Sequence, residues 1–174
     1  MLSLEELREL AKTDAFRAEM KDVFFEAMNN GYANSPKKKS VLWLPGSKTI
    51  EYIRDPWRVV DTYHVTQLST RSGGTTITSY EETPVWIMQY LGEYNEVVIP
   101  CLKAALRAAY GDKQFFGGRG PEFFQYGKYS YRNFSPRNVW HNHRFGDRFN
   151  GNEEINDEDG QLKGWHSYQG CGML

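Results

Sequence analysis

The sequence predicts an α+β protein in which helices pack against an antiparallel sheet. Apolar residues at helical spacing open the chain, within residues 3–30. Short β-rich runs follow, and a second helical stretch over residues 95–110 interrupts them. Groups of strands divided by a helix are typical of an antiparallel sheet rather than of alternating βα units. A length of 174 residues fits one domain. We divide that domain, 1–174, into an N-terminal helical segment (1–30), a first β-rich unit (31–94), and a helix with a second β-rich unit (95–174).

Residues 3–30 predict either one helix with a break or two consecutive helices. Ser3 and Glu6 have the spacing of a capping box, in which each side chain binds the other residue's backbone N–H group. Thr13 can cap a second helix, which places the break near that residue. Gly31 supplies a C-terminal stop, because glycine adopts left-handed backbone angles readily. The apolar residues of the longer stretch share one helical face, which we expect to pack on the sheet: Phe16, Met20, Val23, Phe24, Ala27 and Met28.

Four β-rich runs are predicted before the central helix and four after it. The first four are Thr49–Ile53, Trp57–Thr66, Thr75–Tyr80 and Pro84–Leu91. The later four are Phe123–Tyr131, Val139–Phe145, Glu153–Asn156 and Leu162–Gln169. The Pro84–Leu91 run is almost continuously apolar, which is typical of a central strand. Asp159 and Gly160 form a strong hairpin signal between the last two runs.

One pattern occurs twice along the chain. A glycine is followed by an isoleucine four residues later and by another glycine fifteen residues after that. The two copies are Gly73, Ile77 and Gly92, then Gly151, Ile155 and Gly170. Each copy also follows a predicted helix. We therefore expect two pseudo-repeated units, each a helix with an antiparallel hairpin, that share one sheet.

Composition and charge favour a soluble protein of the cytoplasm. The formal net charge is −1 and the pI is near 6.4, which argues against direct nucleic-acid binding. No apolar run approaches the roughly 20 residues of a membrane span, and no charged-then-apolar leader opens the chain. Cys101 and Cys171 are too few for a disulfide framework. We expect no membrane association, and either a monomer or a homodimer.

Arg119 is the first candidate for a functional residue. It lies in the glycine-rich segment Gly117–Gly120 and precedes Pro121. A guanidinium on such a loop can offer a planar fork to a carboxylate or a phosphate of a ligand. The alternative is a structural role, in which Arg119 pairs with an internal carboxylate. Asp61, Glu122, Glu153 and Glu154 are the candidate partners.

Glu153 and Glu154 point to opposite faces of the predicted strand, so at most one of them faces the interior. An inward carboxylate among aromatic rings can have a raised pKa and act as an acid or a base. Equally, it can serve as the buried partner of Arg119, and the same two alternatives apply to Asp61.

Aromatic residues form the second candidate feature. They account for 15% of the chain, and several fall at inward positions of the predicted strands. Aromatic faces with polar tips suit small organic ligands, although the same residues also build hydrophobic cores. The candidates for the wall of a pocket are Trp86, Tyr90, Tyr129, Tyr131 and Trp165.

His141 and His143 form a weaker candidate for a metal site. Two residues apart on a strand, they would point to the same face, and His166 or Cys171 could complete the ligand set. The same histidines fit a polar strand edge equally well. The chain contains no phosphate-binding P-loop and no G-x-S-x-G segment, and we expect no cofactor.

A series of motifs resembles a family of small bacterial α+β domains of unknown function. The motifs are PVWIMQYLG, LKAALR, GGRGPEFF, GKYSY, FNGNEEI and WHSYQGCG, in that order, and the resemblance covers roughly residues 31–172. Members of that family occur alone or C-terminal to repressor-type helix-turn-helix domains. The chain departs from the family pattern at Thr75 and Thr76, where an acidic residue often occurs, and over residues 134–148, which form a longer segment.

The leading functional expectation is a module that binds or senses a small molecule. It rests on the aromatic strands, the Arg119 loop and the resemblance to domains that accompany transcription regulators. One alternative is an enzyme that uses Arg119 with Glu153 or Glu154. The other is a structural or protein-interaction domain, for example a homodimer joined along an edge strand.

Overall fold

The computed structural model describes residues 2–34, 38–135 and 145–174, and in these residues it confirms the α+β fold. The helices are α1 (Leu4–Ala11), α2 (Asp14–Asn30) and α3 (Ile99–Gly111), with short 3-10 helices η1 (Tyr32–Asn34) and η2 (Glu96–Val98). The strands are β1 (Ser47–Arg54), β2 (Trp57–Val65), β3 (Arg71–Tyr80), β4 (Thr83–Tyr94), β5 (Phe123–Tyr126), β6 (Tyr129–Phe134), β7 (Phe149–Asn156) and β8 (Leu162–Gly172). All eight strands join one antiparallel sheet in the order β1-β2-β3-β4-β8-β7-β6-β5.

The N-terminal segment forms two helices, and capping explains the break between them. Ser3 and Glu6 form the predicted capping box at the start of α1. The Thr13 side chain then accepts a hydrogen bond from the backbone N–H of Phe16, so that α2 begins one residue later.

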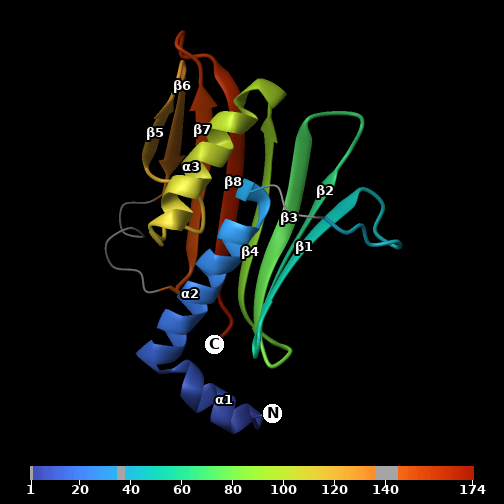
Figure 1. The fold of residues 1–174 in the computed structure, drawn as a ribbon, viewed down its shortest axis with the longest axis vertical. Helices are drawn as coiled ribbons and strands as arrows, with labels where there is room; N and C mark the ends of the chain where they lie inside the picture. The colour runs from blue at the N-terminus through green and yellow to red at the C-terminus, as the bar shows by residue number, and fades with distance from the viewer. Residues whose placement is uncertain (1, 35–37, 136–144) are drawn as a thin grey trace.

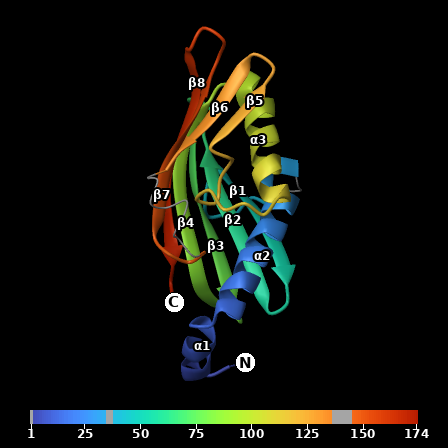
Figure 2. The same cartoon turned by 90° about the vertical axis from the view of Figure 1, so that its left-hand side faces the viewer.

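Helices α2 and α3 cover one face of the sheet, which curls around them (Figures 1 and 2). The core lies between these two layers. Trp86, fully buried on β4, stacks on Phe149 with a centroid distance of 5.6 Å and meets Phe24 of α2 at 4.9 Å. Strand β4 lies between β3 and β8, which confirms the predicted central position of the Pro84–Leu91 run.

The sheet consists of two four-stranded meanders, each preceded by a helix. Strands β1–β4 follow α2, strands β5–β8 follow α3, and β4 pairs with β8. Tyr90 lies directly opposite Tyr168 in that central pair. The two residues also match in the repeated sequence pattern, since each precedes the closing glycine of its copy by two residues. Each half is therefore larger than the predicted helix and hairpin, and a common origin of the halves stays a prediction.

Two predicted strands need correction or lie outside the described part of the chain. The Phe123–Tyr131 run is not one strand but the hairpin of β5 and β6, which turns at Gly127 with a φ of +56°. Glycine is favoured there because side chains rarely adopt that φ. Of the predicted strand Val139–Phe145, residues 139–144 lie outside the described residues, and Phe145 is buried outside any strand.

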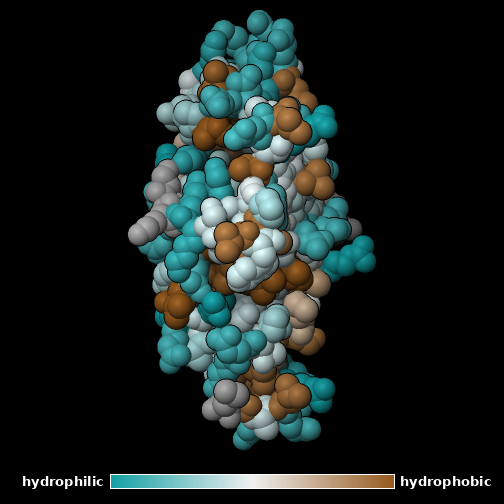
Figure 3. Space-filling view, turned by 90° about the vertical axis from the view of Figure 1, so that its right-hand side faces the viewer, coloured by the Kyte–Doolittle hydropathy of each residue, from teal (hydrophilic) through white to brown (hydrophobic). Residues whose placement is uncertain are grey.

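None of the described helices lies on the outer face of the sheet (Figure 2). Figure 3 looks onto the side that bears β1, where hydrophobic side chains gather near the middle of a largely polar surface. The segment before β1 contributes two strongly exposed apolar residues to the molecular surface, Leu42 and Trp43. Among the described helices, none is long and apolar enough to cross a membrane.

Candidate functional site

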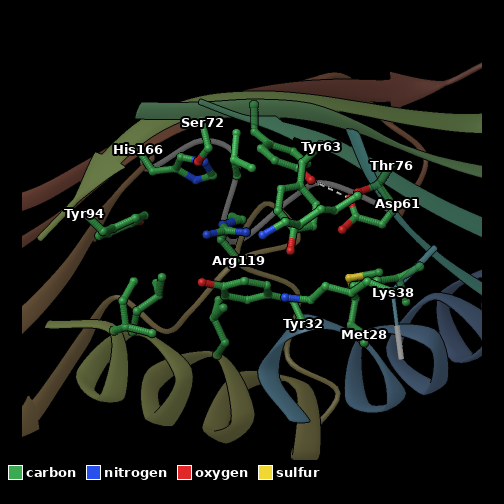
Figure 4. A pocket seen from close by; sticks show the side chains of 18 of the residues that line it. Met28, Tyr32, Lys38, Asp61, Tyr63, Ser72, Thr76, Tyr94, Arg119 and His166 are labelled. Atoms are coloured by element: carbon green, nitrogen blue, oxygen red, sulfur yellow. Dashed lines mark hydrogen bonds between the residues drawn. The ribbon is translucent and has the colours of Figure 1, made fainter. Parts of the chain in front are cut away.

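A cavity of about 420 Å³ lies between the inner face of the sheet and helices α2 and α3. Its size is within the usual range for small-molecule sites. Figure 4 shows Arg119 and His166 at one end, Asp61 and Thr76 at the other, and Tyr32 and Lys38 approaching from the helix side. The strands supply most of the polar lining, because alternate residues of a strand face inward.

Arg119 reaches the cavity from the loop between α3 and β5. Gly117 and Gly118 have φ angles of +69° and +75°, which glycine adopts without strain. The Asn133 side chain then fixes the loop by donating hydrogen bonds to the carbonyls of Phe116 and Gly120, at 3.1 and 2.8 Å. The glycines therefore serve the backbone path that carries a buried arginine under the sheet.

The partner of Arg119 is Glu153, the inward residue of β7. Arg119 Nε and Nη2 both lie 2.8 Å from Glu153 Oε2, and the Glu153 side chain is fully buried. Three more groups contact the same carboxylate. Tyr94 Oη donates to Oε2 at 3.1 Å, Tyr131 Oη donates to Oε1, and His166 Nδ1 lies 3.2 Å from Oε2.

These contacts keep Glu153 ionised. Burial raises the pKa of the Glu153 carboxyl, but the charge of Arg119 and the hydrogen bond from His166 oppose it and hold the pKa well below its ordinary value. Burial likewise lowers the pKa of Arg119, and Glu153 more than restores it. The pair is thus a structural ion pair in which both oxygens of the carboxylate accept hydrogen bonds.

The environment of His166 favours the neutral form of its ring. Burial and the nearby charge of Arg119 lower the pKa of the imidazole, against the opposing effect of Glu153. Because Glu153 is ionised, His166 Nδ1 carries the proton and donates it in their hydrogen bond. His166 Nε2 then remains as an acceptor, with no partner among the described residues, on a side chain that lines the cavity.

Only one of the two carboxylate oxygens of Asp61, on β2, accepts hydrogen bonds from the described residues. Its Oδ1 accepts hydrogen bonds from Tyr90 Oη at 2.6 Å and Thr76 Oγ1 at 2.9 Å. No group of the described residues bonds to Oδ2. Burial raises the pKa of the Asp61 carboxyl, and the two hydrogen bonds only partly oppose this. Oδ2 is not among the fully buried side-chain atoms without a partner, so this oxygen faces the cavity and is available to a hydrogen-bond donor there.

Two lysines and two tyrosines surround the cavity next to Asp61. Lys38 Nζ lies 5.4 Å from the ring centroid of Tyr32 and 5.6 Å from that of Tyr63, in cation–π contact with both. Lys48 also lines the cavity and is the direct cross-strand partner of Tyr63. Burial and Asp61 raise the pKa of Tyr63 to about 12, so its hydroxyl stays protonated.

The structure separates the predicted site residues into three groups. Arg119 and Tyr90 line the cavity, and Glu153 and Tyr131 lie behind Arg119 as its support. Trp86 and Tyr129 pack in or against the core and do not line the cavity. The expectation that Trp165 shares their face is wrong: it is paired with Glu93 and Glu154 on the outer face of the sheet, because strand alternation turns it away from His166.

The predicted metal ligands His141 and His143 lie outside the described residues. Within the described residues, no group of three histidine, cysteine, aspartate or glutamate side chains is arranged to hold a metal ion. The third ligand considered for that site, His166, instead binds Glu153. Cys101 and Cys171 are free cysteines, one buried and one partly buried.

The sequence leaves two roles open for Asp61, an acid or base and a partner of Arg119, and does not place it in the ligand site. The signal was present in the alternation of β2, where Val59, Asp61 and Tyr63 occupy consecutive inward positions. A carboxylate between two buried residues of a strand indicates either an internal partner or a site. His166 carries the same signal between Gly164 and Tyr168 on β8.

Comparison of the chain with models of protein families, with curated protein sequences and with solved structures gave no match. The resemblance to small bacterial α+β domains therefore stays a prediction, and the function is argued from the cavity alone.

Proposed function

We propose that the protein is a small-molecule-binding module and that its ligand occupies the cavity between the sheet and helices α2 and α3. The observation that carries this proposal is the half-used Asp61 carboxylate at the wall of a cavity of about 420 Å³. Asp61 Oδ2 is not one of the fully buried atoms without a partner, so it is accessible from the cavity to a group that enters it. A ligand that donates a hydrogen bond to Oδ2 supplies that group.

The remainder of the lining supports the same use. Apolar side chains from the helices and the sheet provide a surface for the body of an organic molecule, while a few polar atoms converge on it. His166 Nε2 also has no hydrogen-bond partner among the described residues, since Nδ1 is the ring nitrogen that contacts Glu153. Because Glu153 balances the charge of Arg119, this end of the cavity offers neutral hydrogen bonding rather than a bare positive charge.

Geometry disfavours an enzyme that uses Arg119 with Glu153 or Glu154 for proton transfer. Glu153 is buried with four partners, and its pKa is lowered, so it is a poor proton acceptor at neutral pH. Glu154 lies on the outer face of the sheet, beside Trp165. If the cavity performs proton transfer, Asp61, whose Oδ2 faces the cavity, is a carboxylate placed for it.

The test is a thermal-shift screen with a broad metabolite library on the wild type and on two tryptophan variants. Ser72→Trp fills the cavity from β3, and Thr75→Trp places the same side chain on the outer face of that strand. A ligand that binds the native state raises the melting temperature. We expect hits that are retained by Thr75→Trp and lost by Ser72→Trp. Hits retained by both variants, or a complete absence of hits for the wild type, would contradict the proposal.

A further inference from the structure

The carboxylate of Asp61 and the ammonium groups of Lys38 and Lys48 line the same cavity, but among the described residues they form no ion pair with one another. Asp61 and Tyr63 are consecutive inward residues of β2, and Lys48 on β1 is paired with Tyr63. Lys38 Nζ lies over the Tyr63 ring at 5.6 Å. The positive charge of Lys38 acts on the Asp61 carboxyl, yet in the described part of the chain neither lysine forms an ion pair with that carboxylate. The space between the charges is part of the cavity.

A third lysine, Lys103 of α3, lies near Lys38 on the helix side of this space, and Glu96 also lines the cavity. Lys103 Nζ lies 5.2 Å from the ring centroid of Tyr32, the same ring that Lys38 contacts at 5.4 Å. Burial, Lys38 and Arg107 all lower the pKa of Lys103, which indicates crowding of cations at this position. A ligand carboxylate bound at Lys38 reduces the repulsion between Lys38 and its cationic neighbours.

Asp61 would bind a hydrogen-bond donor of the ligand rather than its carboxylate. Its unused Oδ2 accepts a hydrogen bond from an ammonium or a hydroxyl group of a ligand. Because Asp61 and Lys48 lie on neighbouring strands only two residues out of register, that donor must sit beside the ligand carboxylate rather than at a distant end. The apolar lining then receives a side chain, against Ile50, Val59 and Leu102.

We propose that the ligand is a carboxylic acid that carries an ammonium or hydroxyl group next to its carboxylate and an apolar or aromatic side chain. The carboxylate binds at Lys38 and Lys48, the adjacent donor binds Asp61 Oδ2, and the side chain fills the apolar part of the cavity. This class includes amino acids and 2-hydroxy acids. The inference rests on the proposed function, since it names the ligand class of the same cavity.

The test uses four compounds that share one phenyl side chain, each titrated against the full chain by calorimetry. L-phenylalanine and L-3-phenyllactate carry both groups, with an ammonium and a hydroxyl as the respective donor. 3-Phenylpropanoate lacks the donor, and 2-phenylethylamine lacks the carboxylate. We expect at least one of the first two compounds to bind at least tenfold more tightly than both of the others. Their order tells whether the natural donor is an ammonium or a hydroxyl.

Variants assign the two contacts. Lys38→Ala should weaken binding of the better compound at least fivefold and reduce its dependence on ionic strength, because the lost contact is electrostatic. Lys128→Ala, at the β5–β6 turn and outside the cavity, is the matched control and should leave the affinity unchanged. Asp61→Asn should remove the advantage of both compounds over 3-phenylpropanoate.

Three outcomes would overturn the inference: equal binding of all four compounds, no binding of any of them, or binding that Lys38→Ala leaves unchanged. These failures remain distinct from a failure of the proposed function. If the library screen gives hits of another chemical class that Ser72→Trp abolishes, the cavity is a ligand site and only the assigned class is wrong.

Discussion

Replacing Arg119 by alanine should destabilise the protein strongly at neutral pH. The substitution leaves Glu153 fully buried without its counter-charge. Removing one member of a buried ion pair typically costs about 3–5 kcal/mol. An independent estimate gives a similar value. If Glu153 is protonated in the folded variant, protonating a carboxyl with an ordinary pKa near 4.3 at pH 7 costs about 3.7 kcal/mol, at about 1.4 kcal/mol per pH unit.

The pH dependence of this loss of stability tests whether Glu153 is ionised in the folded wild type. In the wild type, Glu153 has a lowered pKa, so its contribution to stability is present above the unfolded pKa and is lost as the pH falls through the folded pKa. In Arg119→Ala, burial without Arg119 makes the folded state bind one more proton than the unfolded state. The stability of the variant then rises as the pH falls, so the difference from wild type should narrow by about 1.4 kcal/mol per unit between pH 7 and pH 5.

The assay is urea denaturation of wild type and Arg119→Ala at pH 7, 6 and 5, followed by tryptophan fluorescence. Arg132→Ala, which removes an arginine from the outer face of β6, is the control and should change stability by no more than about 0.5 kcal/mol. The double variant Arg119→Met with Glu153→Gln should recover part of the loss. A loss below about 1 kcal/mol at pH 7, or a loss that does not change with pH, would refute the assignment of a buried, ionised pair.

Four further predictions concern the support of the site and the molecular surface. Tyr131→Phe removes a hydrogen bond to Glu153 Oε1 and should cost about 1–3 kcal/mol in denaturant unfolding, with a loss near zero arguing against that bond. Gly92→Ala should lower stability by about 1–3 kcal/mol and weaken ligand binding, because a Cβ atom there collides with the His166 ring and the Trp165 carbonyl. Gly111→Ala is the control, because a Cβ atom at the end of α3 lies in open space, and it should be neutral or stabilising by up to about 1 kcal/mol. Nitrogen NMR should find His166 neutral with the proton on Nδ1 at pH 7, and its lowered pKa should make stability decline as the pH falls below about 6.5; a protonated ring at pH 7 would contradict this. Trp43→Ser, at an exposed site, should change unfolding by less than about 0.5 kcal/mol, and light scattering across concentration, run on the same variant, tests whether this surface contributes to the predicted homodimer.

The sequence predicted the architecture where local patterns decide it. Caps at Ser3 and Thr13, the apolar run of β4 and the Asp159-Gly160 turn depend on neighbours in the chain, and the structure follows them. Gly127 was a weaker signal, because one glycine inside an alternating aromatic run is compatible with either a bulge or a turn. Its positive φ divides the predicted strand into β5 and β6.

The site was only partly predictable, because it is assembled from positions far apart in the chain. Glu153 was one of four candidate partners of Arg119, and the sequence could not select it, because strand pairing and loop path, rather than spacing, bring the two together across 34 residues. It could not place Asp61 opposite that pair, since no local pattern records which inward residues of a curved sheet face a cavity. The shared aromatic character of Trp86 and Tyr90 likewise hid their different surroundings, a packed core for one and a cavity wall for the other.

Asp61→Asn tests the central claim most directly, with melting temperature and ligand affinity measured on the same sample. Asparagine keeps the shape of the side chain but removes the buried carboxylate, of which only Oδ1 is bonded within the described residues. If the carboxylate is held ready for a ligand, the variant should be as stable as wild type or slightly more stable, and the best ligand of the screen should bind at least tenfold more weakly. An unchanged affinity, or a large loss of stability in the absence of ligand, would show that Asp61 serves the fold and that the cavity is not the binding site proposed for it.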